Sequence, residues 1–413
     1  MALEIKNISN FSNCYGCGVC AKVCPKHIIN IRLNQQGFYE PTIENLDDCI
    51  NCGLCLQVCS YADDKISVNN KLLKTYAAWS NDAEVRYNCS SGGVGFELGR
   101  FLLKKGYQAC GVRYNCEKQR AEHFIASTEE EFRQSVGSKY IQSYTCDAFY
   151  SINFKDKYLV IGTPCQIDSI RRYIKRFKVQ DNFVLVDFFC HGVPSKFVWD
   201  KYISEVEKIT GKSISVSFRN KSTGWHDSWE MSVNNNSSEL NSKVSWHDSY
   251  NINVREKKRT YSSKWSQGDA FFNLFLSDAC LGKACYDKCK YKYDQSAADI
   301  RIGDLWGHKY RSNEEGVTGV LVFTQKGNDV LNNSNCTLIQ ETLDVVAEGQ
   351  IKQPVKKNVL YDKLMPLVED NNTTIYDLHK IVVHNNKVLR FKDRLRHPLR
   401  TIINVIKKII KKK

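Results

Sequence analysis

Short apolar runs alternate with amphipathic segments through the middle of this 413-residue chain. Runs of strand length lie at residues 109–114, 158–162, 183–190 and 298–303. Apolar residues recur at helical spacing over about 94–104, 167–177 and 195–209. Strands that alternate with helices are typical of an α/β domain with a largely parallel sheet, in which ligands bind beyond the carboxyl ends of the strands.

This pattern is interrupted in two places. Residues 63–74 are polar and aperiodic, which predicts a linker. Residues 212–264 are rich in Ser, Asn and Trp, and they contain WHDS twice, at 225–228 and 246–249. We predict a β-rich insertion with aromatic cross-strand pairs there. A lid over a substrate is the alternative, and no site residue is assigned to this segment.

The end of the chain is amphipathic and strongly basic. Apolar residues recur at helical spacing from Leu395, and residues 387–413 hold eleven Lys or Arg and one Asp. The net charge of +14 therefore belongs mainly to this tail, which argues against a nucleic-acid-binding body. A basic amphipathic helix is typical of a membrane-surface element. The alternative is a helix that packs its isoleucine face on the body.

The chain has 18 cysteines, and their role depends on the compartment of the protein. Residues 1–10 have no basic start followed by an apolar run, and no apolar stretch reaches membrane-spanning length. We therefore expect a reducing cytoplasm, where thiols serve as ligands or catalysts more often than as crosslinks.

Eight of the cysteines form two groups of four near the amino terminus, and we call each closely spaced group a ladder. Cys14, Cys17, Cys20 and Cys24 are spaced C-x2-C-x2-C-x3-C, and Cys49, Cys52, Cys55 and Cys59 repeat this spacing. Pro25 follows the first ladder, and Ser60 stands at the same place after the second. This spacing is typical of a bacterial-type ferredoxin with two 4Fe–4S clusters.

In such modules the fourth cysteine of each ladder binds the other cluster. One cluster is therefore expected on Cys14, Cys17, Cys20 and Cys59, and the other on Cys49, Cys52, Cys55 and Cys24. Zinc is the competing interpretation, but zinc sites use two separated cysteine pairs instead of two unbroken ladders of four.

Unusual residues follow the predicted strands. The segment 163–166 (TPCQ) follows one strand, 190–195 (CHGVPS) follows the next, and 304–307 (DLWG) follows another. Separately, Ser90-Ser91-Gly92-Gly93 opens a predicted helix. Small residues at a helix start can cradle a phosphate through free backbone N–H groups, although a serine is also an ordinary helix cap.

Together these segments resemble the coenzyme F(420) hydrogenase/dehydrogenase beta-subunit family. The matching segments are SSGG at 90–93, GSKYIQS at 137–143, GTPCQI at 162–167, DFFCHGVPS at 187–195, FRNKSTGW at 218–225, ACYDKCKY at 284–291 and ADIRIGDLWG at 298–307. The resemblance implies an iron–sulfur flavoprotein that binds FAD, with Ser91, Gly92 and Gly93 at the phosphates. It also implies that the flavin is lined by Thr163, Pro164 and Gln166.

The resemblance implies further site residues. A third 4Fe–4S cluster is expected on Cys165, Cys190, Cys285 and Cys289. Cys285 and Cys289 are spaced C-x3-C where relatives are expected to have C-x2-C, so Cys280 is an alternative ligand. His191 is a candidate proton donor, and a histidine held by a backbone carbonyl is the alternative. Lys139 is a candidate partner for a phosphate or the reduced flavin, and a solvated lysine is the alternative.

The resulting fold class is an α+β ferredoxin-like two-cluster module followed by an α/β flavin-binding catalytic domain with a β-rich insertion. The predicted division is 1–70 for the ferredoxin module, 75–155 and 156–330 for the two parts of the flavoprotein domain, and 331–413 for a helical extension. The predicted function is an oxidoreductase that passes electrons between the clusters, FAD and a deazaflavin or other organic two-electron substrate. The alternatives are a non-catalytic electron-transfer subunit and a scaffold with purely structural clusters. The predicted partners are a redox protein or electron donor and, through the basic helix, the inner membrane surface.

Overall fold

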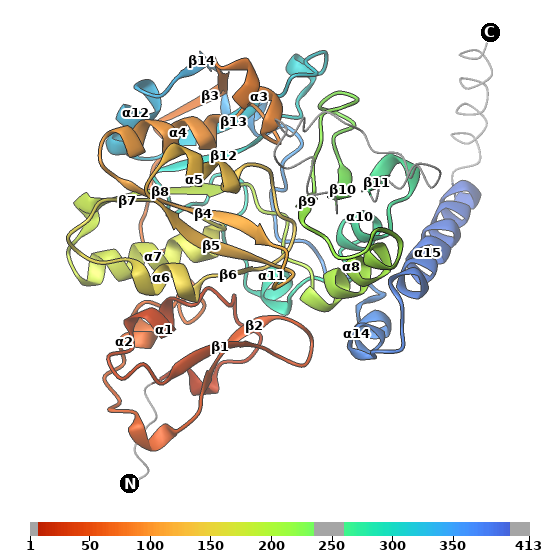
Figure 1. Ribbon diagram of the computed structural model, residues 1–413, viewed down its shortest axis with the longest axis horizontal. Helices are drawn as coiled ribbons and strands as arrows, with labels where there is room; N and C mark the ends of the chain where they lie inside the picture. The colour runs from red at the N-terminus through yellow and green to blue at the C-terminus, as the bar shows by residue number, and fades with distance from the viewer. Residues whose placement is uncertain (1–6, 235–259, 397–413) are drawn as a thin grey trace.

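The computed structural model describes residues 7–234 and 260–396 and is built around one nine-stranded sheet (Figure 1). The strand order is β14-β3-β13-β12-β8-β7-β4-β5-β6. The bounds are β3 Lys74–Ser80, β4 Gln108–Asn115, β5 Arg120–Ala126, β6 Ser143–Tyr144, β7 Tyr158–Ile161, β8 Phe183–Phe188, β12 Ile300–Asp304, β13 Thr318–Val322 and β14 Cys336–Gln340. All four predicted strands are present, with ends that differ by up to two residues from the predicted ones.

The sheet is mixed, so the prediction of a largely parallel sheet is wrong for its two sides. β4, β7, β8 and β12 form a parallel centre. β13, β3 and β14 continue it in antiparallel pairing on one side, and β5 pairs antiparallel with β4 on the other. The physical reason is that β4 and β5 are joined by a short turn at residues 116–119, which favours antiparallel pairing, whereas parallel neighbours need a crossover.

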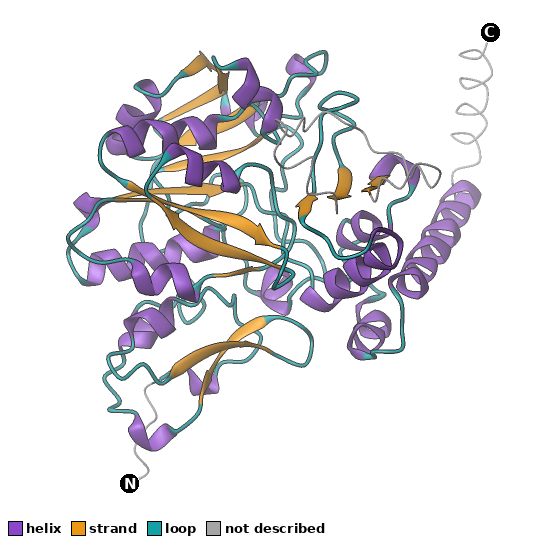
Figure 2. Ribbon diagram, in the orientation of Figure 1, coloured by secondary structure: helices purple, strands orange, loops and turns teal. Residues whose placement is uncertain are grey.

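Successive residues of the central strands face opposite layers of helices (Figure 2). Leu159 and Val184 pack with α4 on one face, whereas Tyr158 and Phe183 pack with α7 on the other. The main helices of these layers are α4 Val94–Lys104, α6 Cys146–Ser151, α7 Pro164–Arg176 and α12 Gln325–Asn332. Because both faces are covered, the central strands are continuous apolar runs.

The amino-terminal module packs against the α6 and α7 side of the sheet (Figure 1). Its elements are α1 Val19–Val23, β1 Ile29–Leu33, β2 Tyr39–Ile43 and α2 Leu54–Gln57. Gly18 and Gly53 begin the two helices with φ angles of +74° and +70°, a conformation that favours glycine. The apolar core of the module is continuous with that of the sheet.

The insertion forms a second, three-stranded antiparallel sheet, as a β-rich segment predicts. Its strands are β9 Ser215–Ser217, β10 Glu230–Asn234 and β11 Thr260–Lys264. They pack with α8 Lys196–Thr210 and α10 Ala270–Phe275 around a core that is rich in aromatic residues, including Trp199 and Phe271. The first WHDS segment lies in the described part of the insertion, and the second lies outside it.

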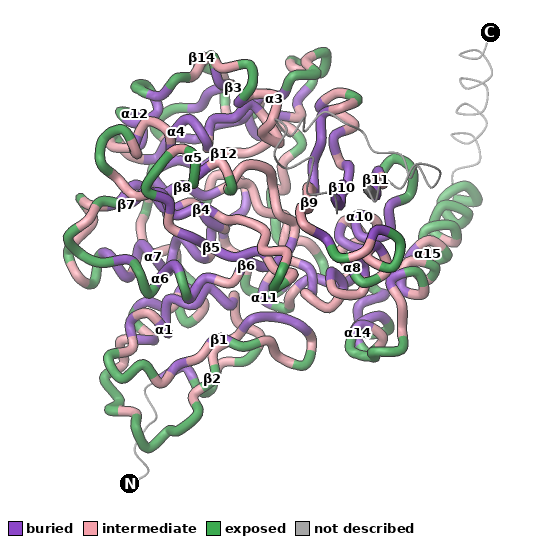
Figure 3. Tube along the Cα trace, in the orientation of Figure 1, coloured by how far each residue is buried: buried purple, intermediate pink, exposed green. Residues whose placement is uncertain are grey.

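The carboxyl-terminal helices are α14 Tyr361–Glu369 and α15 Ile375–Arg396. The first half of α15 has three buried residues, Ile375, Leu378 and Val382, whereas the last ten residues of the helix are mostly exposed (Figure 3). The predicted apolar positions from residue 399 onward lie outside the described residues. In the two described ranges, no helix is both long enough and apolar enough to cross a membrane.

Candidate functional site

Two small cavities in the amino-terminal module are each lined by four cysteines. Cys14, Cys17, Cys20 and Cys59 line one cavity, and we call them the inner cysteine set. Cys24, Cys49, Cys52 and Cys55 line the other, and we call them the outer cysteine set. The structure thus groups the eight thiols as the sequence predicts, with the fourth cysteine of each ladder placed in the other set.

Polar donors reach the sulfur atoms of both sets. The Gly16 N–H lies 3.3 Å from Cys14 Sγ, and the Asn7 side-chain amide lies 3.4 Å from Cys49 Sγ. Burial raises the pKa of Cys59 to about 11 and that of Cys20 well above its ordinary value. Because thiols this buried resist ionisation, a cationic iron centre is the kind of partner that would bind them as thiolates.

A third cysteine set comes from three separate turns. Cys165 lies at the start of α7, Cys190 follows β8, and Cys285 and Cys289 lie in and after the short helix α11 Lys283–Asp287. Burial is the main cause that raises the pKa of Cys165, Cys190 and Cys285. The charges of Cys190 and Cys285 raise the pKa of Cys165 further, and the charge of Cys289 does the same to Cys190 and Cys285. The turn after Cys190 also lies against α11, since a Cβ atom at Gly192 would lie 3.5 Å from Cys285 Cβ, so the four thiols lie in one region of the fold.

Cys280, the alternative ligand, lies apart from this set. It is fully buried in the aromatic core, and burial alone raises its pKa to about 12. Among residues 7–234 and 260–396, no three His, Cys, Asp or Glu side chains meet closely enough to hold a single metal ion. A four-iron cluster binds its thiolates at four different iron atoms, so it requires more widely spaced sulfur atoms.

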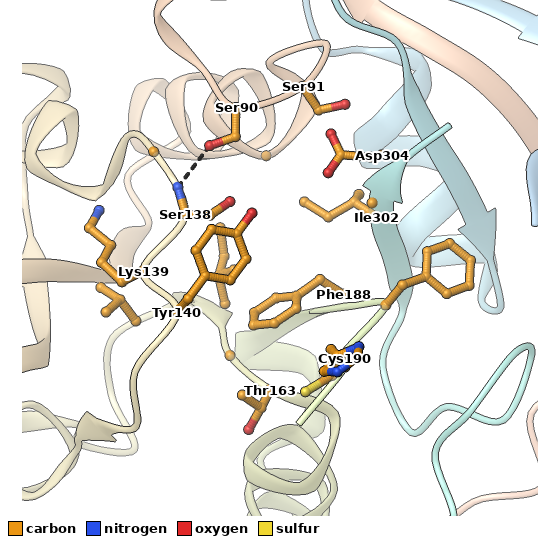
Figure 4. A pocket seen from close by; sticks show the side chains of 18 of the residues that line it. Ser90, Ser91, Ser138, Lys139, Tyr140, Thr163, Phe188, Cys190, Ile302 and Asp304 are labelled. Carbon is orange, nitrogen blue, oxygen red and sulfur yellow. Dashed lines mark hydrogen bonds between the residues drawn. The ribbon is translucent and has the colours of Figure 1, made fainter. Parts of the chain in front are cut away.

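A cavity of about 440 Å³ opens at the carboxyl ends of β7, β8 and β12 (Figure 4). Thr163, Cys190 and Asp304, which lie at or just beyond these strand ends, are among the residues that line it. The turn at 90–95 and the segment 137–141 close its other sides. This is the position at which α/β sheets bind ligands, and the volume lies in the range of cofactor and substrate sites.

The SSGG turn contributes three of its four residues to the cavity wall. Ser90, Ser91 and Gly93 line it, and Gly93 begins α4 with a φ of +87°. Gly92 is directed into the sheet instead: its N–H donates to Thr318 Oγ1, and a Cβ atom there would lie 2.5 Å from the Ala78 carbonyl oxygen. The first turn of α4 thus borders the cavity, where its dipole favours an anion.

Thr163 and Gln166 line the cavity and also hold the start of α7. The Gln166 side chain accepts a hydrogen bond from the Thr163 N–H at 2.9 Å and donates one to Ser143 Oγ at 3.1 Å. Pro164 occupies the first helical position and is buried without lining the cavity. Of the predicted flavin-lining residues, the structure therefore brings Thr163 and Gln166 to the cavity and directs Pro164 elsewhere.

The Lys139 side chain ends on a backbone turn. Its ammonium group donates to the carbonyl oxygens of Gln134, Ser135 and Val136 at 3.0–3.3 Å, and Figure 4 shows it pointing away from Asp304. Burial lowers the pKa of Lys139 to about 7. These contacts are those of a residue that stabilises the cavity wall. The alternative of a solvated lysine is therefore wrong.

His191 lies at the cavity and contacts a carboxylate. Its Nε2 atom is 2.5 Å from Asp278 Oδ1, and its ring packs against Phe275 at 5.1 Å between centroids. Lys292 donates to the carbonyl oxygens of Cys190 and His191, which fixes the turn after β8. The ring is therefore oriented by a carboxylate and not by a backbone carbonyl, the alternative considered from the sequence.

Sequence reasoning missed Arg219, which organises one cavity wall. Its buried guanidinium lies 4.9 Å from the Trp229 ring and 5.5 Å from the Trp306 ring. It donates to Tyr140 Oη at 3.0 Å, to Asp304 Oδ2 at 3.1 Å and to the Ser90 carbonyl oxygen at 3.2 Å. The available signal was its place in the matched FRNKSTGW segment.

Comparisons with known proteins identify the family of the chain. Two family models, for the amino-terminal and carboxyl-terminal parts of the coenzyme F420 hydrogenase/dehydrogenase beta subunit, match residues 75–148 and 155–345 respectively. A 4Fe–4S dicluster domain model matches residues 13–62. The sequence matches no curated protein. A chain of the xenon-derivatised F420-reducing [NiFe] hydrogenase complex from Methanosarcina barkeri is 16% identical, with 78% of this chain and 94% of that chain covered and a TM-score of 0.42.

Proposed function

The chain belongs to the coenzyme F420 hydrogenase/dehydrogenase beta-subunit family, and from this premise we propose that it is an iron–sulfur flavoprotein oxidoreductase. Its dicluster domain makes it an iron–sulfur electron-transfer protein. We propose that it exchanges electrons between two ferredoxin-type clusters, a third cluster and FAD, and passes them to or from a deazaflavin or another organic two-electron substrate. A cytoplasmic location and the division at residues 70, 155 and 330 are parts of the same proposal.

The observation that carries this proposal is the position of Cys190. This thiol belongs to the third cysteine set, and it also lines the 440 Å³ cavity. A cluster on the third set would therefore lie beside a cofactor in the cavity. The inner set lies near Cys165 of the third set, because Ser169 contacts Cys17 and Ser60, and Ser60 contacts the Cys165 carbonyl oxygen.

The cavity walls contain the types of residue that a flavin dinucleotide needs for its phosphates and its ring system. The first turn of α4, with Ser91 and Gly93, would hold the phosphates, and Thr163 and Gln166 would border the ring system. Bound FAD would supply the coupling of one-electron clusters to a two-electron substrate. His191, oriented by Asp278, can hold or release a proton at the cavity, and Arg219 keeps the aromatic wall and the Ser90 turn in place.

The test is the content of iron, acid-labile sulfide and flavin per chain after anaerobic purification. About twelve iron atoms and one FAD are expected, since three four-iron clusters bind twelve iron atoms. A content of about eight iron atoms per chain would show that the third set binds no cluster. If flavin were also absent and could not be restored, the electron-transfer subunit without catalysis would replace the proposal.

A further inference from the structure

A chain of hydrogen bonds connects the inner cysteine set to Cys165. Cys17 Sγ lies 3.3 Å from Ser169 Oγ, and Ser169 Oγ lies 2.8 Å from Ser60 Oγ. Ser60 Oγ in turn lies 3.0 Å from the Cys165 carbonyl oxygen, and the Ser60 N–H donates to Ser169 Oγ at 3.2 Å. Both serines are fully buried, so water does not compete for these groups.

The cysteine ladders differ at this point of the chain. Pro25 follows the first ladder, whereas Ser60 stands at the corresponding place after the second. A proline has neither an N–H nor a hydroxyl group, so it could make none of these bonds to Ser169 and Cys165. Ser60 and Ser169 come from different domains, which means that the contact exists only because the ferredoxin-type module is docked against α7.

The direction of each bond follows from the ligand state of Cys17. A thiolate bound to iron has no proton and can only accept. Ser169 Oγ has one hydrogen and then donates it to Cys17 Sγ. The 2.8 Å contact between the two hydroxyl oxygens therefore requires the Ser60 hydroxyl to donate to Ser169 Oγ, with the Cys165 carbonyl oxygen at 3.0 Å as its second acceptor. In this arrangement every polar hydrogen of the two buried serines has an acceptor.

We propose that Ser169 is a positioning residue that raises the reduction potential of the cluster on the inner cysteine set through its hydrogen bond to Cys17, and that the backbone N–H of residue 60 orients the Ser169 hydroxyl. This inference rests on the proposed function, since it requires a cluster on the inner set. A hydrogen bond to a ligand sulfur stabilises the more negative, reduced cluster, and such bonds are among the factors that set cluster potentials. The inner cluster is thereby a better electron acceptor than its cysteine ligands alone would make it.

The experiment is an EPR-monitored redox titration of the anaerobically purified full chain and of two variants. Ser169→Ala removes the donor to Cys17, so we expect the midpoint potential of one cluster to fall by about 59 mV, a tenfold change in a one-electron equilibrium. Ser60→Ala keeps the Ser169 hydroxyl and leaves Cys17 as its acceptor, so no fall in potential is expected. The cluster on the outer set is the internal control, and its potential stays unchanged in both variants.

The two variants separate a specific hydrogen bond from general damage. Equal downward shifts in both, or no shift in Ser169→Ala, would overturn the inference while the clusters and the proposed function stood. Iron content and the EPR signal of each variant show whether it has folded, and Ser169→Thr, which keeps a hydroxyl, gives the second reading if Ser169→Ala fails to fold. A wild-type chain without reducible clusters would overturn the proposed function itself.

Discussion

At the scale of single residues, hydrogen bonding decides which predicted site residues reach the cavity. Gly92 belongs to the SSGG motif, yet its N–H donates to Thr318, and the Lys139 ammonium is held by three carbonyl oxygens. Gly93, which follows Gly92 in the same motif, and His191, in the DFFCHGVPS segment, line the cavity. Membership of a motif therefore predicts location near the site, whereas the direction of a side chain depends on partners that are distant in sequence.

Replacement of Cys285 and of Cys280 will show which thiol belongs to the third cluster. Cys285→Ala is expected to lower the iron content by about four atoms per chain, since one four-iron cluster would lose a ligand. Cys280→Ala should keep all the iron and lose only a small amount of stability from the cavity it leaves. Iron analysis of both anaerobically purified variants is the measurement. Iron loss in Cys280→Ala with full iron in Cys285→Ala would reverse the assignment.

His123 should make stability fall at acid pH. Its Nε2 lies 3.2 Å from the Ile161 carbonyl oxygen, its Nδ1 is buried without a partner, and burial lowers its pKa to about 4. Between pH 6.5 and 4 the unfolded chain therefore binds a proton that the folded chain does not, so stability decreases as the pH falls through this window. Over the whole window the free energy of unfolding falls by about 3 kcal/mol, at 1.36 kcal/mol per pKa unit.

The measurement compares melting temperatures of the wild type and His123→Gln from pH 7.5 to pH 5. The glutamine amide can donate to the Ile161 carbonyl oxygen but does not titrate, so this variant should lose less stability on acidification than the wild type. His384→Gln, on the exposed side of α15, is the control and should follow the wild type. Parallel curves for the wild type and His123→Gln would refute the assigned role.

At the scale of elements, buried strands and capped helices were predictable because their signals are local. β7 and α7 agree with the sequence pattern, since a run of apolar residues is followed by Thr163 as helix cap and Pro164 in the first turn. The antiparallel sides of the sheet were not predictable, because pairings such as β3 with β13 join residues more than 200 positions apart. The two Ser60–Ser169 bonds escaped prediction for the same reason.

The exposed end of α15 should bind anionic lipid. Five basic residues lie between Lys387 and Arg396, and Phe391 and Leu395, four residues apart on one face, are 62% and 66% exposed. Basic residues near an anionic surface contribute about 1 kcal/mol each, so we expect the protein to float with phosphatidylserine-containing vesicles and not with neutral ones. Arg390→Glu combined with Arg394→Glu should reduce this binding at least tenfold.

A matched control replaces exposed apolar residues elsewhere. Phe391→Ser with Leu395→Ser should weaken binding to anionic vesicles, whereas Ile339→Ser with Val359→Ser, at exposed positions distant in sequence, should not. Binding that is equal for neutral and anionic vesicles, or unchanged in the charge variant, would favour the alternative in which this helix packs on protein.

At the scale of the whole molecule, the ferredoxin-type module is fixed to the body. The Gln142 side chain accepts a hydrogen bond from the Tyr39 N–H and donates one to the Tyr15 carbonyl oxygen, and Thr145 Oγ1 donates to the Cys17 carbonyl oxygen. The predicted linker 63–74 is also held, because Lys290 donates to carbonyl oxygens within it. The order of the three cysteine sets and the cavity is therefore a fixed property of the fold.

From this order we predict that electrons from a partner enter at the outer cysteine set. Cys52 is exposed, and Leu46 and Ile50 beside it are 47% and 58% exposed. Asp47 and Asp48 add negative charge to the same surface, although the chain as a whole is basic. A small apolar centre with an acidic rim fits a donor of positive charge, because complementary charge raises the rate of encounter.

Reversal of this local charge tests the entry point with a donor of known charge. Cationic reduced methyl viologen should reduce the clusters of Asp47→Lys/Asp48→Lys several-fold more slowly than those of the wild type at low salt, with the difference decreasing as salt screens the charges. Glu84→Lys/Glu130→Lys changes the net charge by the same amount at exposed positions outside the module. Stopped-flow reduction of the two variants separates local from global charge, since a global effect would slow both equally. Equal rates would place the entry of electrons at a surface other than the one around Cys52.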